Sequence, residues 1–382
     1  MGSYTGARRA YTAVVDRASR DHTATDRAEK QVMKTQKLDP LVDPGSNKWG
    51  KSRRSLIRFN DMPDGRFEVA VGLSVPVEIM LDTTGSMGGN VDIALKGIPD
   101  TRDNLQAVMR QGCEAHVATG VFNDVVDRFP GGTPGIVLTR SQFEMTEKMA
   151  EQMMHHIPMR MGAGNGKEDS QFGLFAAAYL SSFYINRIGL KSYHFTMTDD
   201  AADSTIDPDD LMRIFGDDVA KAVAKNGHEI DIQNLSTETV VQDLLTRVHA
   251  FCLLVNANER VTRFWQKLMG EERVIALPDT ILVSQVMPAI VGLTEGTLEL
   301  SSVVAYLEER GVSKSDAKLI ERSVRNIPIG AQMQLENYNK IPIRGDIFAK
   351  KDDLWPVVKA EKRDDFHKFI AGDFDKETGA WL

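Results

Sequence analysis

The chain has 382 residues, 42% of them hydrophobic and 26% charged, a composition typical of a globular protein of one large domain or two ordinary ones. No apolar run approaches the roughly 20 residues that a membrane-spanning helix needs, and the polar start of the chain does not resemble a signal peptide. The two cysteines, Cys113 and Cys252, lie in apolar, strand-like surroundings. These features argue against a membrane protein and a disulfide framework, and we expect a cytoplasmic location.

The net charge of −8 is unevenly distributed along the chain. Residues 1–58 contain 13 Lys or Arg and 6 Asp or Glu, a net charge of +7, which leaves −15 for the remainder. A basic segment attached to an acidic domain is typical of a segment that docks on another protein surface. We interpret residues 1–64 as an extended or partly helical arm, which either lies on its own acidic domain or joins copies of the chain into a homo-oligomer. Nucleic-acid binding by the arm is the less favoured alternative.

From about Phe67 onward, short apolar runs alternate with segments of helical periodicity. The predicted strands lie at 67–71, 75–81, 115–122, 192–198, 249–255 and 273–277. The predicted helices lie at 91–111, 141–156, 171–185, 208–225, 237–247, 260–269 and 281–293. This alternation predicts an α/β fold over residues 65–297, a doubly wound, mainly parallel, Rossmann-like sheet flanked by helices.

Two further helices are predicted beyond this domain, at 298–309 and 314–324. We expect them to form a helical hairpin within residues 298–330. Residues 331–382 show little pattern and are expected to form a C-terminal tail.

Oxygen-bearing side chains follow the strand at 75–81. Asp82, Thr84 and Ser86 are spaced at i, i+2 and i+4, and Gly85 allows the backbone to turn between them. Open parallel sheets bind ligands at the carboxyl ends of their strands, and hard oxygens are the ligands that Mg²⁺ prefers. The sequence therefore predicts a metal site at this loop.

Acidic residues also follow two other predicted strands. Asp124 comes after the strand at 115–122, and Asp199 and Asp200 come after the strand at 192–198. A single Asp at such a turn more often caps a helix. The combination of the Asp82 loop with Asp199 instead favours a metal ligand at Asp199, with Asp124 and Asp200 lying next to the ligands.

The segment Val77-Glu78-Ile79-Met80-Leu81-Asp82-Thr83-Thr84-Gly85-Ser86-Met87 resembles the first strand and the metal-ion-dependent adhesion site (MIDAS) of von Willebrand factor type A (vWA) domains. Val121–Asp124 and Phe195–Asp199 are similar to later strand ends of that family, and the resemblance covers residues 65–297. It implies the vWA fold, with Asp82, Thr84, Ser86 and Asp199 as metal ligands.

One loop departs from the family pattern, which usually has a Thr at this point. Residues 162–170 read Gly-Ala-Gly-Asn-Gly-Lys-Glu-Asp-Ser and contain no Thr. The loop resembles the Gly-Gly-Gly-Asp-x-x-Glu loop of prokaryotic intracellular members, with Asn165 at the Asp position. Asn165, Glu168 and Ser170 stay open as the group that approaches the ion here; Asn165 is taken as the further ligand and Glu168 as its neighbour. Loss of the Thr predicts weak metal affinity without a partner.

The resemblance implies metal-dependent protein binding. The cofactor is expected to be Mg²⁺, or another divalent cation such as Mn²⁺ or Ca²⁺, and a partner protein is expected to supply an Asp or Glu to it. We expect a bacterial or phage adaptor, not an enzyme and without catalytic residues, acting with a MoxR-type AAA+ ATPase or in a conflict system. Two alternatives stay open: a structural protein whose arm and tail make oligomer contacts, and, less favoured, a metal-dependent hydrolase.

Overall fold

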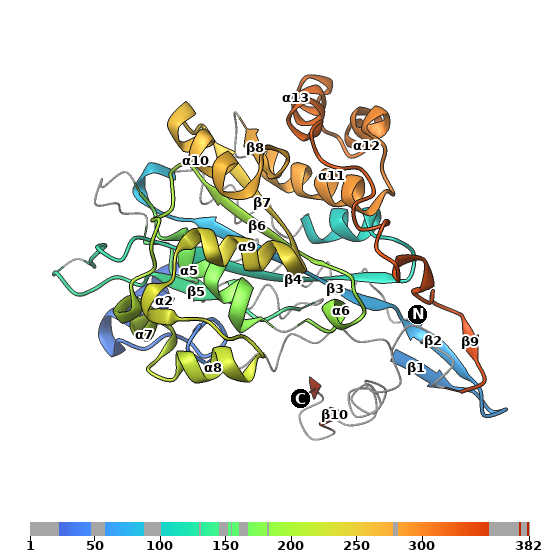
Figure 1. Cartoon of the computed structure of the whole chain (residues 1–382), viewed down its shortest axis with the longest axis horizontal. Helices are drawn as coiled ribbons and strands as arrows, with labels where there is room; N and C mark the ends of the chain where they lie inside the picture. The colour runs from blue at the N-terminus through green and yellow to red at the C-terminus, as the bar shows by residue number, and fades with distance from the viewer. Residues whose placement is uncertain are drawn as a thin grey trace.

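The computed structural model describes residues 23–46, 58–87, 101–129, 131–144, 152–153, 155–159, 167–181, 183–277, 282–350, 374–375 and 380–381. Its centre is a six-stranded sheet in the order β5-β4-β3-β6-β7-β8 (Figure 1). The strands are β3 (Leu73–Asp82), β4 (Cys113–Phe122), β5 (Leu138–Arg140), β6 (Ser192–Thr198), β7 (Val248–Val255) and β8 (Val274–Leu277). All neighbours pair in parallel except β5, which is antiparallel to β4. The doubly wound, mainly parallel sheet predicted from the sequence is confirmed.

The central strand β3 is buried along its whole length, because helices cover both faces of the sheet. On one face the end of Met80 lies 3.0 Å from the position that a Cβ on Gly173 would take, so α5 packs there. On the other face the Tyr193 hydroxyl donates to Glu295 of α11. The helices in chain order are α5 (Ser170–Phe175), α6 (Tyr184–Arg187), α7 (Pro208–Phe215), α8 (Val219–Lys225), α9 (Thr237–Arg247), α10 (Glu259–Met269) and α11 (Val283–Glu295).

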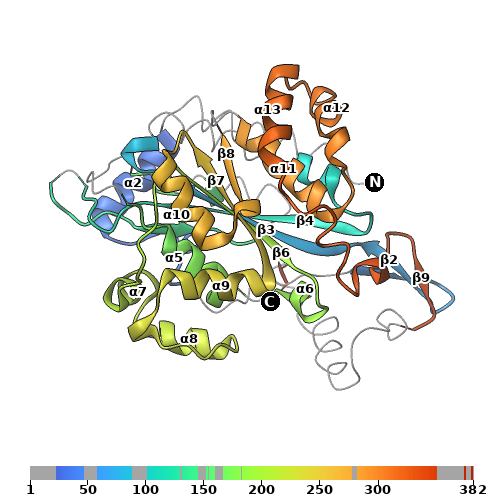
Figure 2. The same cartoon turned by 45° about the horizontal axis from the view of Figure 1, so that its top comes forward.

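Elements outside this domain lie at both of its ends (Figure 2). The N-terminal arm contains α2 (Thr23–Thr35), at the end of the molecule where β3 finishes. The segment after α2 reaches α7, since a Cβ on Gly45 would lie 3.7 Å from the carbonyl oxygens of Ile214 and Phe215. At the other end, β1 (Arg58–Asp61), β2 (Phe67–Val71) and β9 (Ile347–Phe348) form a small antiparallel sheet. The helix pair α12 (Val303–Glu308) and α13 (Lys314–Val324) follows α11.

The structure differs from the sequence-based elements at several points. The helix predicted over 171–185 continues from α5 as a π-helix (Ala176–Leu180) and stops at Ser181, which is extended. The helix predicted over 208–225 is interrupted at Gly216, whose φ of 88° is outside the helical range. The strand at 67–71 belongs to the small sheet, and β5 was not predicted because three residues carry little periodicity.

Two predicted helices lie partly outside the described residues. Of the helix expected at 91–111, residues 101–111 are described; 101–108 are helical, and the helix ends there, three residues earlier than predicted. The helix expected at 141–156 is wrong at its start: residues 141–144 are not helical, and Glu144 instead pairs with Val117 of β4 through two backbone hydrogen bonds of 3.0 Å. Residues 152–153 are helical, and residues 145–151 and 154 lie outside the described residues. In the portion of the chain that the structure describes, no helix combines the length and apolar character needed to cross a membrane. Cys113 and Cys252 are buried and free, as expected.

Candidate metal-binding site

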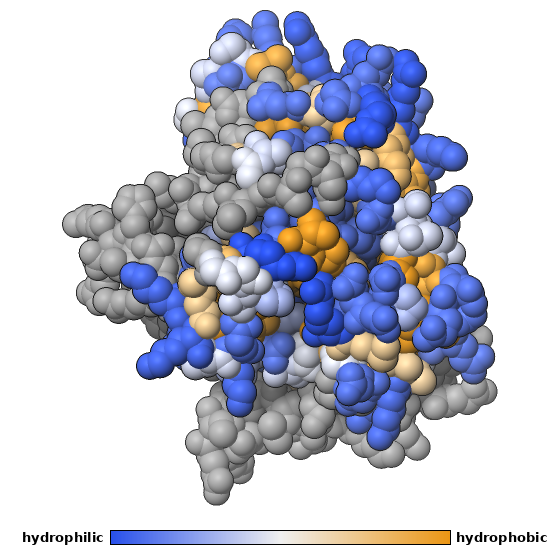
Figure 3. Space-filling model, turned by 90° about the vertical axis from the view of Figure 1, so that its left-hand side faces the viewer, coloured by the Kyte–Doolittle hydropathy of each residue, from blue (hydrophilic) through white to orange (hydrophobic). Residues whose placement is uncertain are grey.

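The Asp82 loop lies at the carboxyl end of β3. This strand pairs with β4 on one side and with β6 on the other, so the chain order reverses next to it. Such a switch point in a parallel sheet leaves a crevice in which ligands bind. Figure 3 shows the end of the molecule where β3 finishes, and most coloured side chains there are hydrophilic.

Four side-chain oxygens form a continuous series across this crevice. Thr84 Oγ1 donates to Asp82 Oδ1 at 2.6 Å and lies 3.2 Å from Ser86 Oγ. Ser86 Oγ donates to Asp199 Oδ1 at 2.9 Å. Asp82 and Thr84 are completely buried, whereas Ser86 is exposed. Residues 113 positions apart in sequence thus meet at one site, as the sequence predicted.

Thr198, the last residue of β6, holds the second oxygen of Asp82. Its hydroxyl donates to Asp82 Oδ2 at 2.7 Å and accepts from the backbone N–H of Asp200 at 3.1 Å. Sequence analysis identified Thr198 only as a strand end. Because β6 pairs in parallel with β3, the last residue of β6 lies beside the last residue of β3, which is Asp82.

Glu168 belongs to the loop before α5 and lies beside the Asp82 loop. Its backbone N–H donates to the carbonyl of Ala201 at 2.9 Å, which fixes this loop to the end of β6. The side chain is 8% exposed and lies within hydrogen-bonding reach of Thr84. Its Oε2 atom is buried and has no hydrogen-bond partner in the described structure. Ser170 Oγ is likewise buried without a partner, at the start of α5.

The carboxyl groups of the site share one electrostatic environment. Burial raises the pKa of Asp82 to about 7, although hydrogen bonds from Thr84 and Thr198 oppose the rise. Burial and the negative charge of Asp82 raise the pKa of Glu168 to about 9. Burial also raises the pKa of Asp199. Carboxyl groups are therefore packed together here at a cost that a divalent cation would offset.

The remaining predicted residues are placed differently. Asp124 lies close enough for its charge to raise the pKa of Glu168, but its Oδ1 accepts from the backbone N–H of Val126 at 2.9 Å. The Asp200 carboxylate accepts from the N–H of Ala201 at 2.8 Å and so is bound within its own turn. Asn165 lies outside the described residues.

The donor set fits a small, hard cation. Within the described ranges, no group of three or more His, Cys, Asp or Glu side chains is arranged to hold a metal ion. A cation at this loop would therefore rely on the hydroxyls of Thr84 and Ser86 together with Asp82. Octahedral Mg²⁺, with bonds of about 2.0–2.1 Å, places neighbouring ligand oxygens about 2.9 Å apart. Ser86 Oγ lies 2.9 Å from Asp199 Oδ1, which equals this spacing, and 3.2 Å from Thr84 Oγ1, which is longer.

No protein-family model matches the chain, and no match was found among curated proteins. Similar solved structures include three proteins, each 13% identical to this chain. The match to proximal thread matrix protein 1 from the mussel byssus covers 58% of this chain and 46% of that chain, with a TM-score of 0.36. The match to the pilus adhesin SpaC from Lactobacillus rhamnosus GG covers 71% of this chain and 34% of that chain, with a TM-score of 0.37. The match to a von Willebrand factor type A protein from Catenulispora acidiphila covers 60% of this chain and 43% of that chain, with a TM-score of 0.31.

A further structure of the byssus protein has a zinc occupied MIDAS motif; it is 9% identical and covers 58% of this chain and 48% of its own, with a TM-score of 0.34. Each of these matches spans less than half of the solved chain. The fold assignment therefore rests on this chain's own strand order. That order gives the doubly wound, mainly parallel sheet expected from the sequence, with the Asp-x-Thr-x-Ser loop at the carboxyl end of its strand β3.

Proposed function

We propose that this protein is a metal-dependent protein-binding protein of the vWA kind, an adaptor or scaffold. The Asp82 loop holds a divalent cation, Mg²⁺ as the first choice, through Asp82, Thr84 and Ser86, with Asp199 beside it. A partner protein contributes an Asp or Glu to the open side of the cation. The observation that carries this proposal is the series of oxygens from Asp82 to Asp199, which ends at an exposed Ser86.

The chemistry of the loop supports binding rather than catalysis. Its hydroxyls and carboxylates hydrogen bond to one another, an arrangement that presents lone pairs to an ion. Most of the coloured side chains on the end of the molecule where β3 finishes are hydrophilic, which supports recognition of a charged group over burial of an apolar one (Figure 3). A MoxR-type AAA+ ATPase partner, a bacterial or phage origin and a cytoplasmic setting are proposed from the sequence resemblance alone.

Calorimetric titration of the full chain with Mg²⁺ and Mn²⁺ tests the metal half of this proposal. We expect weak binding to the wild type and loss of binding in Asp82→Asn and Ser86→Ala, because each removes a ligand. Ser204→Ala, which changes an exposed hydroxyl of the 199–207 loop, should bind as the wild type does. Tight Mg²⁺ binding without a partner would contradict the expected weak affinity, and equal binding by Asp82→Asn would refute the site.

In the competing structural role the ion only stabilises the fold, and this role predicts a different result for Asp82→Ala. If the cation serves a partner, the variant keeps its circular dichroism spectrum and cooperative unfolding but loses metal binding. If the cation only stabilises the fold, the variant unfolds. A hydrolase would release phosphate from phosphoesters in the presence of Mg²⁺, and we expect no such turnover.

A further inference from the structure

Asn123 follows β4 directly and is completely buried. Its side-chain amide uses all four of its hydrogen bonds. Oδ1 accepts from Thr83 Oγ1 at 2.5 Å and from the N–H of Met159 at 3.2 Å. Nδ2 donates to the carbonyls of Ile136 at 2.7 Å and Ile157 at 3.2 Å. One side chain thus joins the Asp82 loop to two segments that lie far from it in sequence.

Thr83 transmits this connection to the metal ligands. It stands between Asp82 and Thr84 and is itself fully buried. Its backbone N–H also donates to the carbonyl of Phe122 at 3.1 Å, so both its main chain and its hydroxyl are fixed to the end of β4. These bonds hold Thr83 in one orientation. Asn123 therefore fixes the orientation of the backbone on either side of Thr83, from which the side chains of Asp82 and Thr84 extend.

The other side of Asn123 supports the N-terminal arm. Ile157 and Met159, which bond to Asn123 through their main chain, form a separate hydrophobic cluster with Val32 of α2 and Phe129. Val32 is 3% exposed, so α2 buries this apolar side chain against Phe129, Ile157 and Met159. Partly buried side chains complete the cluster: Ala28, Met33, Leu38 and Ile136.

Two further contacts hold the arm at the same edge of the sheet. The carbonyl of Val42 accepts from the N–H of Arg140 at 2.8 Å, which covers the open side of the edge strand β5. The carboxylate of Asp39 lies 3.2 Å from Nδ1 of His155. The arm therefore binds the segments that Asn123 connects to the Asp82 loop, by apolar, backbone and polar contacts together.

We propose that Asn123 is a positioning residue for the metal loop and that the docked arm, residues 23–46, keeps it in position. Arm docking and metal binding then stabilise each other, because each favours the same arrangement of Asn123, Ile157 and Met159. The metal half of this inference rests on the proposed function. The link between the arm and the loop is independent of it and is measurable without metal.

Val32→Asp tests the link by placing a carboxylate in the apolar contact of α2. Gln31→Asp is the matched control, because Gln31 is exposed on the same helix. In metal-free hydrogen exchange of the full chain, we expect Val32→Asp to speed exchange in α2 and in residues 82–87, and Gln31→Asp to change neither. In Mg²⁺ titration, Val32→Asp should weaken binding at least about fivefold, the lower end of typical coupling.

Asn123→Asp examines the positioning role directly. It keeps the acceptor for Thr83 and loses the amide donors to Ile136 and Ile157, so Mg²⁺ should bind more weakly and α2 should exchange faster. Adding Val32→Asp to it should weaken Mg²⁺ binding little further, because the connection is already broken.

Faster exchange in α2 with unchanged exchange at residues 82–87 would overturn the inference. So would additive losses of affinity in the double variant. If the wild type bound no Mg²⁺ while Val32→Asp still loosened residues 82–87, the proposed function would fail and the link between arm and loop would stand.

Discussion

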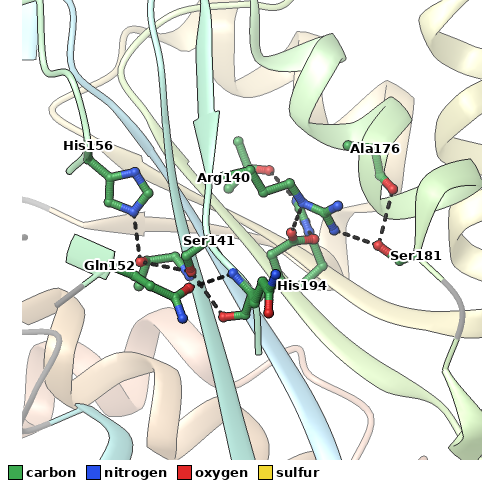
Figure 4. A network of polar contacts seen from close by, with 11 residues as sticks. Arg140, Ser141, Gln152, His156, Ala176, Ser181 and His194 are labelled. Carbon is green, nitrogen blue, oxygen red and sulfur yellow. Dashed lines mark hydrogen bonds and ion pairs between the residues drawn. The ribbon is translucent and has the colours of Figure 1, made fainter. Parts of the chain in front are cut away.

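Glu78 is a charged side chain in the middle of the central strand, and it is 1% exposed. Arg140 of β5 bonds to one of its oxygens, and Nδ1 of His194 lies 3.1 Å from the other. The Arg140 guanidinium also donates to Ser181, whose hydroxyl donates to the carbonyl of Ala176 in the π-helix (Figure 4). Burial alone would raise the pKa of Glu78, but the charge of Arg140 and the His194 bond hold it at about 2.

Glu78→Gln should destabilise the protein by about 3–5 kcal/mol, because it leaves the buried Arg140 without its counter-charge. The measurement is the free energy of unfolding in urea at pH 7. Glu238→Gln, an exposed change on α9, should stay within about 0.5 kcal/mol of the wild type. Similar losses in the two variants would show that the buried pair contributes no special stability.

His156 is a second buried polar residue, held between two threonines. Nε2 lies 2.9 Å from Thr119 Oγ1 and Nδ1 lies 2.8 Å from Thr139 Oγ1. Burial lowers the pKa of His156 to about 3, so the ring is neutral in the folded protein at neutral pH. Below about pH 6.5 His156 binds a proton in the unfolded chain but not in the folded protein. The free energy of unfolding therefore falls as the pH decreases from 6.5 toward 3.

His156→Gln removes this pH dependence while leaving a polar group between Thr119 and Thr139. Between pH 7.5 and pH 5, the wild type should lose about 2 kcal/mol more unfolding free energy than the variant does. Urea unfolding at the two pH values measures the difference, and groups common to both proteins cancel. An equal loss in both proteins would mean that His156 is protonated in the folded state.

At the scale of elements, β4 lies between the edge strand β5 and the central strand β3, and the side chain of Arg140 on β5 crosses it to reach Glu78 on β3. In the register, Gly120 pairs with Met80 on one side and with Arg140 on the other, and Ala118 pairs with Glu78. Two small residues on β4 therefore leave space for Arg140 to cross to Glu78. A Cβ on Gly120 would clash with Met80 Sδ and would lie 2.9 Å from the carbonyl oxygen of Thr139.

Gly120→Ala should therefore destabilise the sheet by about 1–3 kcal/mol through overpacking. Met80→Ala removes one of the two obstacles, so the double variant should be more stable than the sum of the single changes predicts. The readout is the urea midpoint of the three variants. Strict additivity would indicate that the Thr139 carbonyl, and not Met80, limits the space at this position.

At the scale of the whole molecule, a bound cation should stabilise the fold by mass action. Mg²⁺ at ten times its Kd adds about 1.4 kcal/mol to the unfolding free energy if the unfolded chain does not bind it. Differential scanning calorimetry should show a rise in Tm with Mg²⁺ for the wild type and no rise for Asp82→Asn. A rise in both proteins would show that Mg²⁺ acts elsewhere on the molecule.

The fold class and the core of the site were predictable from the sequence because both depend on local patterns. Apolar runs and helical periodicity define β3, β4, β6 and β7 without knowledge of the tertiary structure. Asp82, Thr84 and Ser86 lie within five residues of one another, and Asp199 follows a recognisable strand. Strand ends in a parallel sheet meet at one edge, which is why Asp199 and Ser86 come together.

Tertiary structure alone decided the contacts between distant segments. Glu78 appears in the sequence as one acidic residue in an apolar run, and only the strand order shows that Arg140 neutralises it. In the sequence Asn123 only follows a predicted strand, yet its four hydrogen bonds reach residues up to 40 positions away from it. Buried polar groups must find partners wherever the fold brings them, so those partners follow from packing and not from spacing along the chain.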